Sequence, residues 1–169
     1  MRISVITVCF NAAATLTDAV QSVLSQVPSP EVPFDLEYIV VDGESTDGTL
    51  DILAPFRDRI ATLISEPDQG LYDAMNKGIR AATGDVVAIL NADDVYASTD
   101  VLARVAATFR ETDAEAVYGD LHYVDATDLG KVTRRWRAGA YSRGAFRRGW
   151  MPPHPALFVQ RSCYERWGL

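Results

Sequence analysis

A chain of 169 residues has room for one domain with a sizeable core. Hydrophobic residues make up 48% of the chain and charged residues 23%, the balance of an ordinary globular domain, and the formal net charge is −7. No apolar run approaches the roughly 18 residues that a membrane-spanning helix needs, and the first ten residues contain no signal-peptide cleavage site. We therefore exclude an integral membrane protein and expect a cytoplasmic one.

The net charge hides an asymmetry along the chain. Residues 1–130 carry 22 acidic and seven basic side chains, whereas residues 131–169 carry one acidic and nine basic side chains. All three tryptophans also fall in the second segment. Such a split predicts either two functional surfaces on one fold or a basic appendage.

The first 110 residues alternate between short buried apolar runs and amphipathic segments. The apolar runs predict strands, at residues 2–10, 36–41, 60–65 and 86–90. The amphipathic segments predict helices, at residues 16–27 with Asn11 as a cap, 49–57, 70–82 and 99–110. This alternation predicts a mostly parallel sheet with helices on both faces.

The remainder of the chain has a different pattern. Residues 116–124 predict one longer strand, and a turn at residues 127–130 leads into a second strand at 131–137. Residues 138–155 are irregular, and residues 156–159 are strand-like. The hairpin-like pattern predicts an antiparallel addition to the parallel sheet.

Polar clusters follow three of the predicted strands. They are Thr7 with Phe10 and Asn11, Asp42 with Glu44 and Asp47, and Asn91 with Asp93 and Asp94. Parallel strands bring their carboxyl ends to one edge of the sheet, where open α/β sheets bind ligands. Each cluster alone is explained by loop capping, and together they predict a polar pocket.

Asp93 and Asp94 are neighbouring carboxylates, which repel each other unless a cation lies between them. A divalent metal carrying a phosphate substrate meets that need, and hard oxygen ligands suit Mg²⁺ or Mn²⁺. Aspartates that only cap the next helix are the alternative. The chain has neither a Gly-x-Gly-x-x-Gly loop nor a Walker lysine motif, so a bound nucleotide would need the metal to neutralise its diphosphate.

Five ordered motifs resemble glycosyltransferase family 2, whose members have the GT-A fold. They are ISVITVCFN at residues 3–11, YIVVDGESTDGT at 38–49, SEPDQGLYDAMNKGI at 65–79, GDVVAILNADD at 84–94 and VYGD at 117–120. The resemblance covers essentially the whole chain and is strongest to bacterial enzymes that build envelope polysaccharides and glycolipids. It implies a single GT-A domain over residues 1–169, with a nucleotide-sugar-binding half at 1–110 and an acceptor-side half at 111–169.

The resemblance also implies roles for single positions. The implied donor-binding residues are Thr7, Phe10, Asn11, Asp42, Glu44, Asp68, Lys77, Asn91, Ala92 and Asp93. Asp42 would read uracil, while Asp47, in the same turn, either joins it or caps the next helix. Asp93 and Asp94 would hold Mg²⁺ or Mn²⁺, although Asn91 stands where many relatives have a carboxylate. His154 would lie on the acceptor side, and a structural histidine between two prolines is the alternative.

The catalytic base is less well defined. Relatives in the family continue beyond a Trp-Gly-Leu-like end with a stretch that carries an aspartate used as the general base, so the acceptor-side half is expected to be incomplete. Asp120 is the remaining carboxylate that chain order places near an acceptor, and it is our candidate catalytic residue. We expect the chain as given to bind donor far better than it transfers the sugar.

The expected function is that of a metal-dependent, inverting glycosyltransferase. It would move a sugar from a nucleoside-diphosphate sugar, with UDP as the expected carrier, to a hydroxyl of a saccharide or lipid-linked acceptor. The alternatives are a non-catalytic nucleotide-sugar-binding module and a sugar nucleotidyltransferase. Nucleic acid is not an expected partner.

The basic and aromatic residues of segment 131–169 allow two interpretations. Arginine pairs with phosphate and tryptophan prefers the headgroup zone, so the segment could contact the inner face of a membrane as a peripheral surface. Alternatively, its arginines offset the acidic part of the fold or reach the donor diphosphate.

Overall fold

The computed structural model describes residues 1–169 and confirms an α/β fold with a mostly parallel sheet. The main sheet has six strands in the order β3 (Thr62–Ser65), β2 (Asp35–Asp42), β1 (Arg2–Cys9), β4 (Val86–Ile89), β8 (Leu157–Gln160) and β5 (Ala116–Tyr118). The first four strands in this order run parallel, and β8 lies antiparallel between β4 and β5. A separate two-stranded hairpin pairs β6 (Leu121–Asp125) with β7 (Asp128–Trp136).

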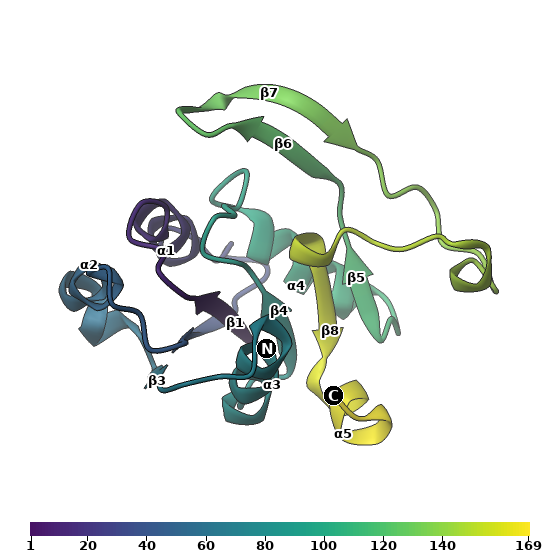
Figure 1. Ribbon diagram of the computed structural model, residues 1–169. Helices are drawn as coiled ribbons and strands as arrows, with labels where there is room; N and C mark the ends of the chain where they lie inside the picture. Colours follow the sequence, from purple (N-terminus) through teal and green to yellow (C-terminus); the bar gives the residue numbers. More distant parts are fainter.

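Helices cover both faces of the main sheet (Figure 1). They are α1 (Leu16–Leu24), α2 (Thr49–Leu53), α3 (Leu71–Ala81), α4 (Val101–Glu111) and α5 (Arg161–Trp167), with 3₁₀ turns η1 (Ala54–Arg59), η2 (Phe146–Arg148) and η3 (His154–Ala156). One core cluster joins α1, α2 and α4 to one face of the sheet, and a second joins α3 to the other face. None of the helices is long and apolar enough to cross a membrane.

The central strand β1 shows why the sheet forms. Its alternate residues Ile3 and Val5 belong to the first core cluster, whereas Ile6 and Val8 belong to the second. A strand that is apolar on both alternations is stable only when both its faces are covered, as in a parallel sheet. Helix α3 packs so closely that a Cβ at Gly78 would lie 2.4 Å from Cγ2 of Ile6.

The prediction of one longer strand at residues 116–124 was wrong. The chain pairs with β8 only up to Tyr118 and leaves the main sheet at Gly119 and Asp120, before β6 begins. The Gly119 N–H still bonds to the Ala156 carbonyl at 2.9 Å, and the Asp120 carboxylate accepts the Ala138 N–H at 3.0 Å. These two hydrogen bonds lie where the chain leaves the main sheet and enters the hairpin. Their partners, Ala156 and Ala138, lie far along the chain from Gly119 and Asp120.

Two local predictions also need correction. Asn11 does not cap the first helix, because Thr15 is the N-cap and Asn11 has a left-handed backbone with φ of 50°. The helix expected at residues 49–57 is α-helical only through Leu53 and continues as the 3₁₀ turn η1. Pro55 lacks the N–H that the next α-helical hydrogen bond would need.

Candidate functional site

The edge of the main sheet that is formed by one set of strand ends faces the hairpin of β6 and β7 (Figure 1). The carboxyl ends of β1 to β5 and the amino end of β8 meet there, because β8 alone runs in the opposite direction. From β1 the chain first builds β2 and β3 on one side and then crosses to β4 on the other side. Open α/β sheets bind ligands at such a switch in strand order, so we call the surface beyond the carboxyl ends of β1 and β4 the crevice.

The loops after β1 and β2 are hydrogen-bonded to each other. The Asn11 N–H donates to the Ser45 Oγ at 2.8 Å, and the Asn11 Oδ1 accepts from the Thr46 N–H at 3.0 Å. Both Asn11 and Glu44 have left-handed backbones, with φ of 50° and 66°. A non-glycine residue in this region is uncommon and is kept there by its surroundings.

Asp47 and Thr49 complete this contact. The Asp47 carboxylate accepts from the Ala13 N–H at 3.0 Å and from the Thr49 N–H at 3.0 Å, and the Thr49 hydroxyl accepts from the Ala12 N–H at 2.9 Å. The hydrogen bond from Thr49 is the largest cause that lowers the pKa of Asp47. Asp47 therefore joins the two loops, and it also accepts the N–H of Thr49, the first residue of α2. The second contact is the one expected of a residue that caps the next helix.

Two of the expected donor-binding residues lie inside the protein. Thr7 is fully buried, and its hydroxyl accepts from the Tyr38 hydroxyl at 3.0 Å. Asp42 is also fully buried, and its carboxylate accepts from the Ser65 hydroxyl at 2.7 Å and the Ser45 N–H at 3.1 Å. Both side chains are therefore buried and hydrogen-bonded within the protein, and their role in donor binding stays a prediction.

The Cys9 thiol lies against the same carboxylate. Its sulfur is 3.7 Å from the Asp42 Oδ1. Burial, followed by the charge of Asp42, raises the pKa of the Cys9 thiol to about 12. Cys9 is therefore an inert neutral donor that helps to satisfy the buried Asp42.

Above Asp42, the surface is formed by Phe10, Gly43 and Asp68. The Phe10 side chain is 65% exposed. A Cβ at Gly43 would lie 2.5 Å from the Asp68 Oδ2 and 3.4 Å from the Phe10 ring. The Asp68 Oδ1 accepts from the Gly70 N–H at 2.8 Å, which leaves Oδ2 beside Gly43. An exposed ring and one carboxylate oxygen thus flank a glycine that leaves them room.

Lys77 fixes the loop that carries Asp68. Its ammonium donates to the Pro67 carbonyl at 2.7 Å and lies 3.0 Å from the Glu66 carboxylate and 3.5 Å from that of Asp73. The hydrogen bond and charge of Glu66 raise the pKa of Lys77. Its side chain is only 17% exposed, so Lys77 supports the loop that carries Asp68.

The turn after β4 brings Asn91, Ala92, Asp93 and Asp94 to the crevice. The Asp94 N–H bonds to the Asn91 carbonyl at 3.1 Å, and the Asn91 Nδ2 donates to the Asp94 Oδ2 at 3.0 Å. The Asn91 Oδ1 is buried and accepts no hydrogen bond, Ala92 is buried, and Asp93 is exposed. Burial, and then the charge of Asp93, raises the pKa of Asp94.

This donor set fits a divalent cation. Three oxygen-bearing side chains lie on one short turn, and a buried carbonyl oxygen without a partner is rare unless a ligand or ion satisfies it. No group of three or more His, Cys, Asp or Glu side chains is close enough to hold a metal by itself. Mg²⁺ is commonly held by one or two carboxylates together with substrate phosphates, so the set matches a shared site.

His154 and Asp120 reach the same edge from the second half of the chain. His154 opens η3, is exposed, and has a charge that lowers the pKa of Asp94 against the larger effect of burial. Asp120 follows β5 and is exposed, and its carboxylate accepts one hydrogen bond, from the Ala138 N–H. The structure therefore brings both residues to the carboxyl edge with Asn91, Asp93 and Asp94.

Sequence reasoning missed Ser65, Gly43 and Tyr118. Ser65 holds Asp42 across the pair β2–β3, and Gly43 leaves space for Asp68. The Tyr118 hydroxyl donates to the Gly139 carbonyl at 3.0 Å and accepts from the Tyr141 N–H at 2.8 Å. A glycine directly after a buried strand was a usable signal for Gly43, whereas the other two act through partners at least 20 residues away.

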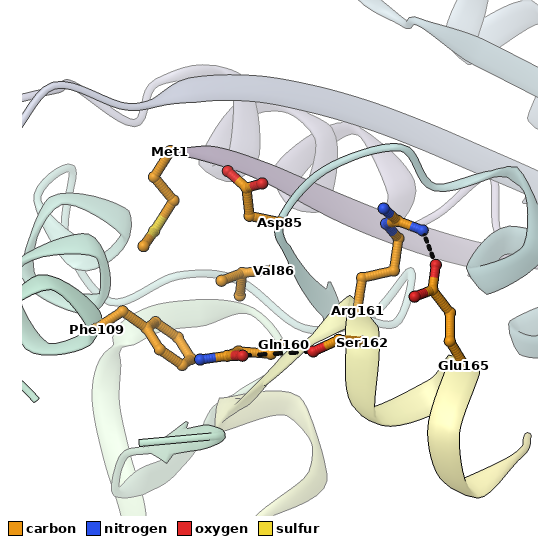
Figure 2. A pocket seen from close by; sticks show the side chains of 8 residues that line it. All are labelled: Met1, Asp85, Val86, Phe109, Gln160, Arg161, Ser162 and Glu165. Atoms are coloured by element: carbon orange, nitrogen blue, oxygen red, sulfur yellow. Dashed lines mark hydrogen bonds and ion pairs between the residues drawn. The ribbon is translucent and has the colours of Figure 1, made fainter. Parts of the chain in front are cut away.

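A separate hollow of about 320 Å³ lies at the opposite edge of the sheet (Figure 2). It is lined by Met1, Asp85, Val86, Phe109, Gln160, Arg161, Ser162 and Glu165. Figure 2 shows that its one cationic side chain, Arg161, is paired with Glu165. No expected site residue lines this hollow, so the crevice between β1 and β4 remains the candidate site.

A family model described as "Glycosyl transferase family 2" matches residues 4–160. A "PGL/p-HBAD biosynthesis glycosyltransferase" of Mycobacterium bovis is 36% identical over 167 residues, which cover 95% of this chain and 60% of that protein. An uncharacterized glycosyltransferase of a Nostoc species is 37% identical over 131 residues, which cover 76% of this chain and 38% of that protein. The chain thus spans about 60% of the length of the mycobacterial relative.

Solved structures support the fold. TarS 1–349 from S. aureus, in complex with UDP-GlcNAc, superposes with a TM-score of 0.74 at 20% identity, covering 98% of this chain and 47% of that one. The mannosyltransferase PcManGT from Pyrobaculum calidifontis, in complex with GDP-Man and Mn²⁺, gives a TM-score of 0.71 at 23% identity, covering 99% and 46%. The expectation of a GT-A fold is confirmed.

Proposed function

Because this chain belongs to glycosyltransferase family 2, we propose that its crevice binds a nucleoside-diphosphate sugar with a divalent cation and that the sugar is transferred to an acceptor hydroxyl. The turn from Asn91 to Asp94 is the observation that carries this proposal. It presents two neighbouring carboxylates and a buried, unpartnered carbonyl oxygen at the switch point of the sheet. Family membership favours transfer over the sugar nucleotidyltransferase alternative.

The base of the donor would lie over Gly43, against the exposed Phe10 ring. Asp68 offers one oxygen there, because its other oxygen accepts the Gly70 N–H. Uracil presents a single imide N–H, which matches a single acceptor, whereas guanine presents two adjacent donors. We therefore propose UDP as the carrier and Asp68 as the residue that accepts from the base, with the buried Asp42 fixing the turn below it through Ser45 and Ser65.

The diphosphate would lie near Asp93, Asp94 and the Asn91 Oδ1, which would hold Mg²⁺ or Mn²⁺ together with phosphate oxygens. When bound, such a cation would stabilise the negative charge that grows on the leaving diphosphate. His154 lies close enough to affect the charge of Asp94. We propose that it donates a hydrogen bond on the acceptor side of this group.

Transfer would proceed with inversion at the anomeric carbon. Asp120 would accept the proton of the attacking acceptor hydroxyl, from the end of β5, where its carboxylate is exposed and is positioned by the Ala138 N–H. General-base help is worth about 10²- to 10⁴-fold in rate. We propose a saccharide or lipid-linked acceptor and a peripheral contact with a membrane through residues 131–169.

Titration calorimetry with UDP tests donor binding. Mn²⁺ is expected to tighten binding at least about 10-fold, and a chelator to remove the gain, because phosphates and carboxylates share the ion. Asp93→Ala should lose this gain, while Asp113→Ala, an exposed change outside the crevice, should keep it. Equal affinity with Mn²⁺ and with chelator would contradict the metal site, and tighter binding of GDP would contradict the assignment of UDP.

Mass spectrometry of products from a panel of nucleotide sugars tests transfer. Asp120→Asn should lower the transfer rate at least about 100-fold without changing UDP affinity, because the amide oxygen can still accept the Ala138 N–H. Metal-dependent binding without transfer from any donor would favour the alternative of a non-catalytic nucleotide-sugar-binding module.

A further inference from the structure

Residues 137–153, between β7 and η3, form a loop with a defined shape at the carboxyl edge (Figure 1). The Tyr118 hydroxyl bridges the Gly139 carbonyl and the Tyr141 N–H. The Trp150 Nε1 donates to the Ala138 carbonyl at 2.7 Å. The loop is therefore fixed at its start and at its end.

Apolar side chains of this loop are kept exposed. Tyr141 is 52% exposed, Phe146 59% and Met151 65%. The Tyr141 and Phe146 rings are 6.0 Å apart, and each packs against Trp150, at 5.5 and 5.3 Å. The rings of Tyr141, Phe146 and Trp150 therefore pack on one another, and the outer surface of this ring cluster has no partner in the chain.

The same region is strongly basic. Residues 131–151 contain seven basic and no acidic side chains, in a chain whose net charge is −7. The six arginines of this stretch make no ion pair, and they are Arg134, Arg135, Arg137, Arg143, Arg147 and Arg148. Arg143 and Arg147 are exposed and flank Phe146 in sequence.

We propose that the loop 137–153, together with β7, docks on the headgroups of anionic phospholipids and inserts Phe146 and Met151 between them. Aromatic side chains prefer the headgroup zone, and each basic residue near an anionic surface contributes about 1 kcal/mol. The alternation of free arginines with exposed apolar side chains matches a surface that is anionic outside and apolar beneath.

The charge distribution also fixes an orientation. Residues 1–130 carry a net charge of −15, from 22 acidic and seven basic side chains, so an anionic surface repels that part of the protein. The basic strand β7 and the loop 137–153 then face the lipid, and α5 with the C-terminus lies at the far edge of the sheet (Figure 1). This docking specifies the peripheral membrane contact proposed above and does not depend on donor binding or sugar transfer, so it can fail separately.

Co-sedimentation of the chain, without donor, with phosphatidylglycerol–phosphatidylcholine vesicles tests the proposal. At low salt, the chain should bind these vesicles and not pure phosphatidylcholine, and binding should fall as salt is raised. Arg143→Gln with Arg147→Gln should lower the partition coefficient about 30-fold, at about 1 kcal/mol for each charge. Arg80→Gln with Arg104→Gln removes two exposed arginines elsewhere and should change it less than twofold.

A second pair of variants tests insertion. Met151→Glu should lower the partition coefficient at least about 10-fold, because it places a charge where the apolar side chain enters the lipid. Val27→Glu, an equally exposed apolar residue after α1, should have little effect. Equal binding to both vesicle types, or no loss in the Arg143 and Arg147 variant, would overturn the proposal. So would binding of a single-stranded oligonucleotide, or self-association, that competes with the vesicles.

Discussion

Residues 1–110 and residues 111–169 build the same edge of the sheet by different means. In the first region β1, β2 and β4 are buried almost throughout, and the loops after β1 and β2 bond to one another. In the second region eight of the nine residues of β7 are exposed, and the loop 137–153 depends on a few aromatic and polar contacts. The first region is therefore fixed by the core, and the second region by local contacts that can open separately.

Gly78→Val should separate the two regions most strongly. The added side chain would collide with Ile6, since a Cβ alone would lie 2.4 Å from its Cγ2, and overpacking of this kind costs about 3 kcal/mol. Gly130→Ala, in the hairpin, meets only the Asp128 carboxylate at 3.2 Å and should cost less than about 0.5 kcal/mol. Urea unfolding of both variants measures the difference, and similar losses would contradict a core built mainly by the first region.

Gly43→Ala should reduce donor binding without unfolding the protein. The new methyl group would displace the Asp68 Oδ2, the far end of a flexible side chain, from its place 2.5 Å away. Affinity for UDP should fall about 10-fold, the effect of losing one hydrogen bond to a charged group, while the gain from Mn²⁺ persists. Gly119→Ala, whose Cβ would meet Ala156 at an ordinary 3.9 Å, is the matched control. Unchanged calorimetric affinity in Gly43→Ala would remove Asp68 from the base pocket.

The fold of the first region was predictable because its signals are local. Runs such as Val86 to Leu90 and the helical spacing of Leu16, Val20 and Val23 belong to single elements, and the structure confirms them as β4 and α1. The place of β8 between β4 and β5 was not predictable, because it pairs Val87 with Val159 and Val117 with Phe158. Contacts across more than 40 residues leave no periodic trace in the sequence.

The sequence predicted at which edge of the sheet the site residues lie better than it predicted which of their side chains are buried. Strand order alone brings Asn91, Asp93 and Asp94 to the edge where they were expected. The burial of Asp42 depends on the Ser65 hydroxyl of the neighbouring strand, and no pattern in the turn itself indicates that partner. The roles of these four residues, Asn91, Asp93, Asp94 and Asp42, in donor binding stay predictions.

Tyr118→Phe should loosen the loop 137–153 alone. Losing the hydroxyl breaks its bonds to the Gly139 carbonyl and the Tyr141 N–H, so the amide of Tyr141 should exchange about 5- to 10-fold faster, the effect of about 1 kcal/mol. Tyr123→Phe, in the exposed hairpin, removes a hydroxyl without such bonds and is the control. Hydrogen exchange followed by mass spectrometry measures the amide exchange rates of both variants. If Tyr118→Phe also made the amides of β1 exchange faster, the two regions would not open separately.

Asp94→Asn should give the smallest effect, and its sign differs from that of a typical site mutation. Burial and the charge of Asp93 raise the pKa of Asp94, so the folded protein disfavours the ionised form. Above the raised pKa this charge opposes folding, and the amide removes it while keeping an oxygen for the Asn91 Nδ2. Without metal at pH 7, the variant should therefore melt higher, by less than about 3 °C.

The pH dependence distinguishes this effect from a change in packing. Since the folded pKa is raised, wild type is relieved of the cost below 3.8, the ordinary pKa of an aspartate, and carries it in full once the pH exceeds the folded pKa. The advantage of Asp94→Asn should thus be absent near pH 4 and grow toward pH 7. In saturating Mn²⁺ and UDP it should reverse, because the ligands then use the carboxylate. Melting curves over this range decide, and a gain that is equal at every pH would show that the charge of Asp94 is not its cause.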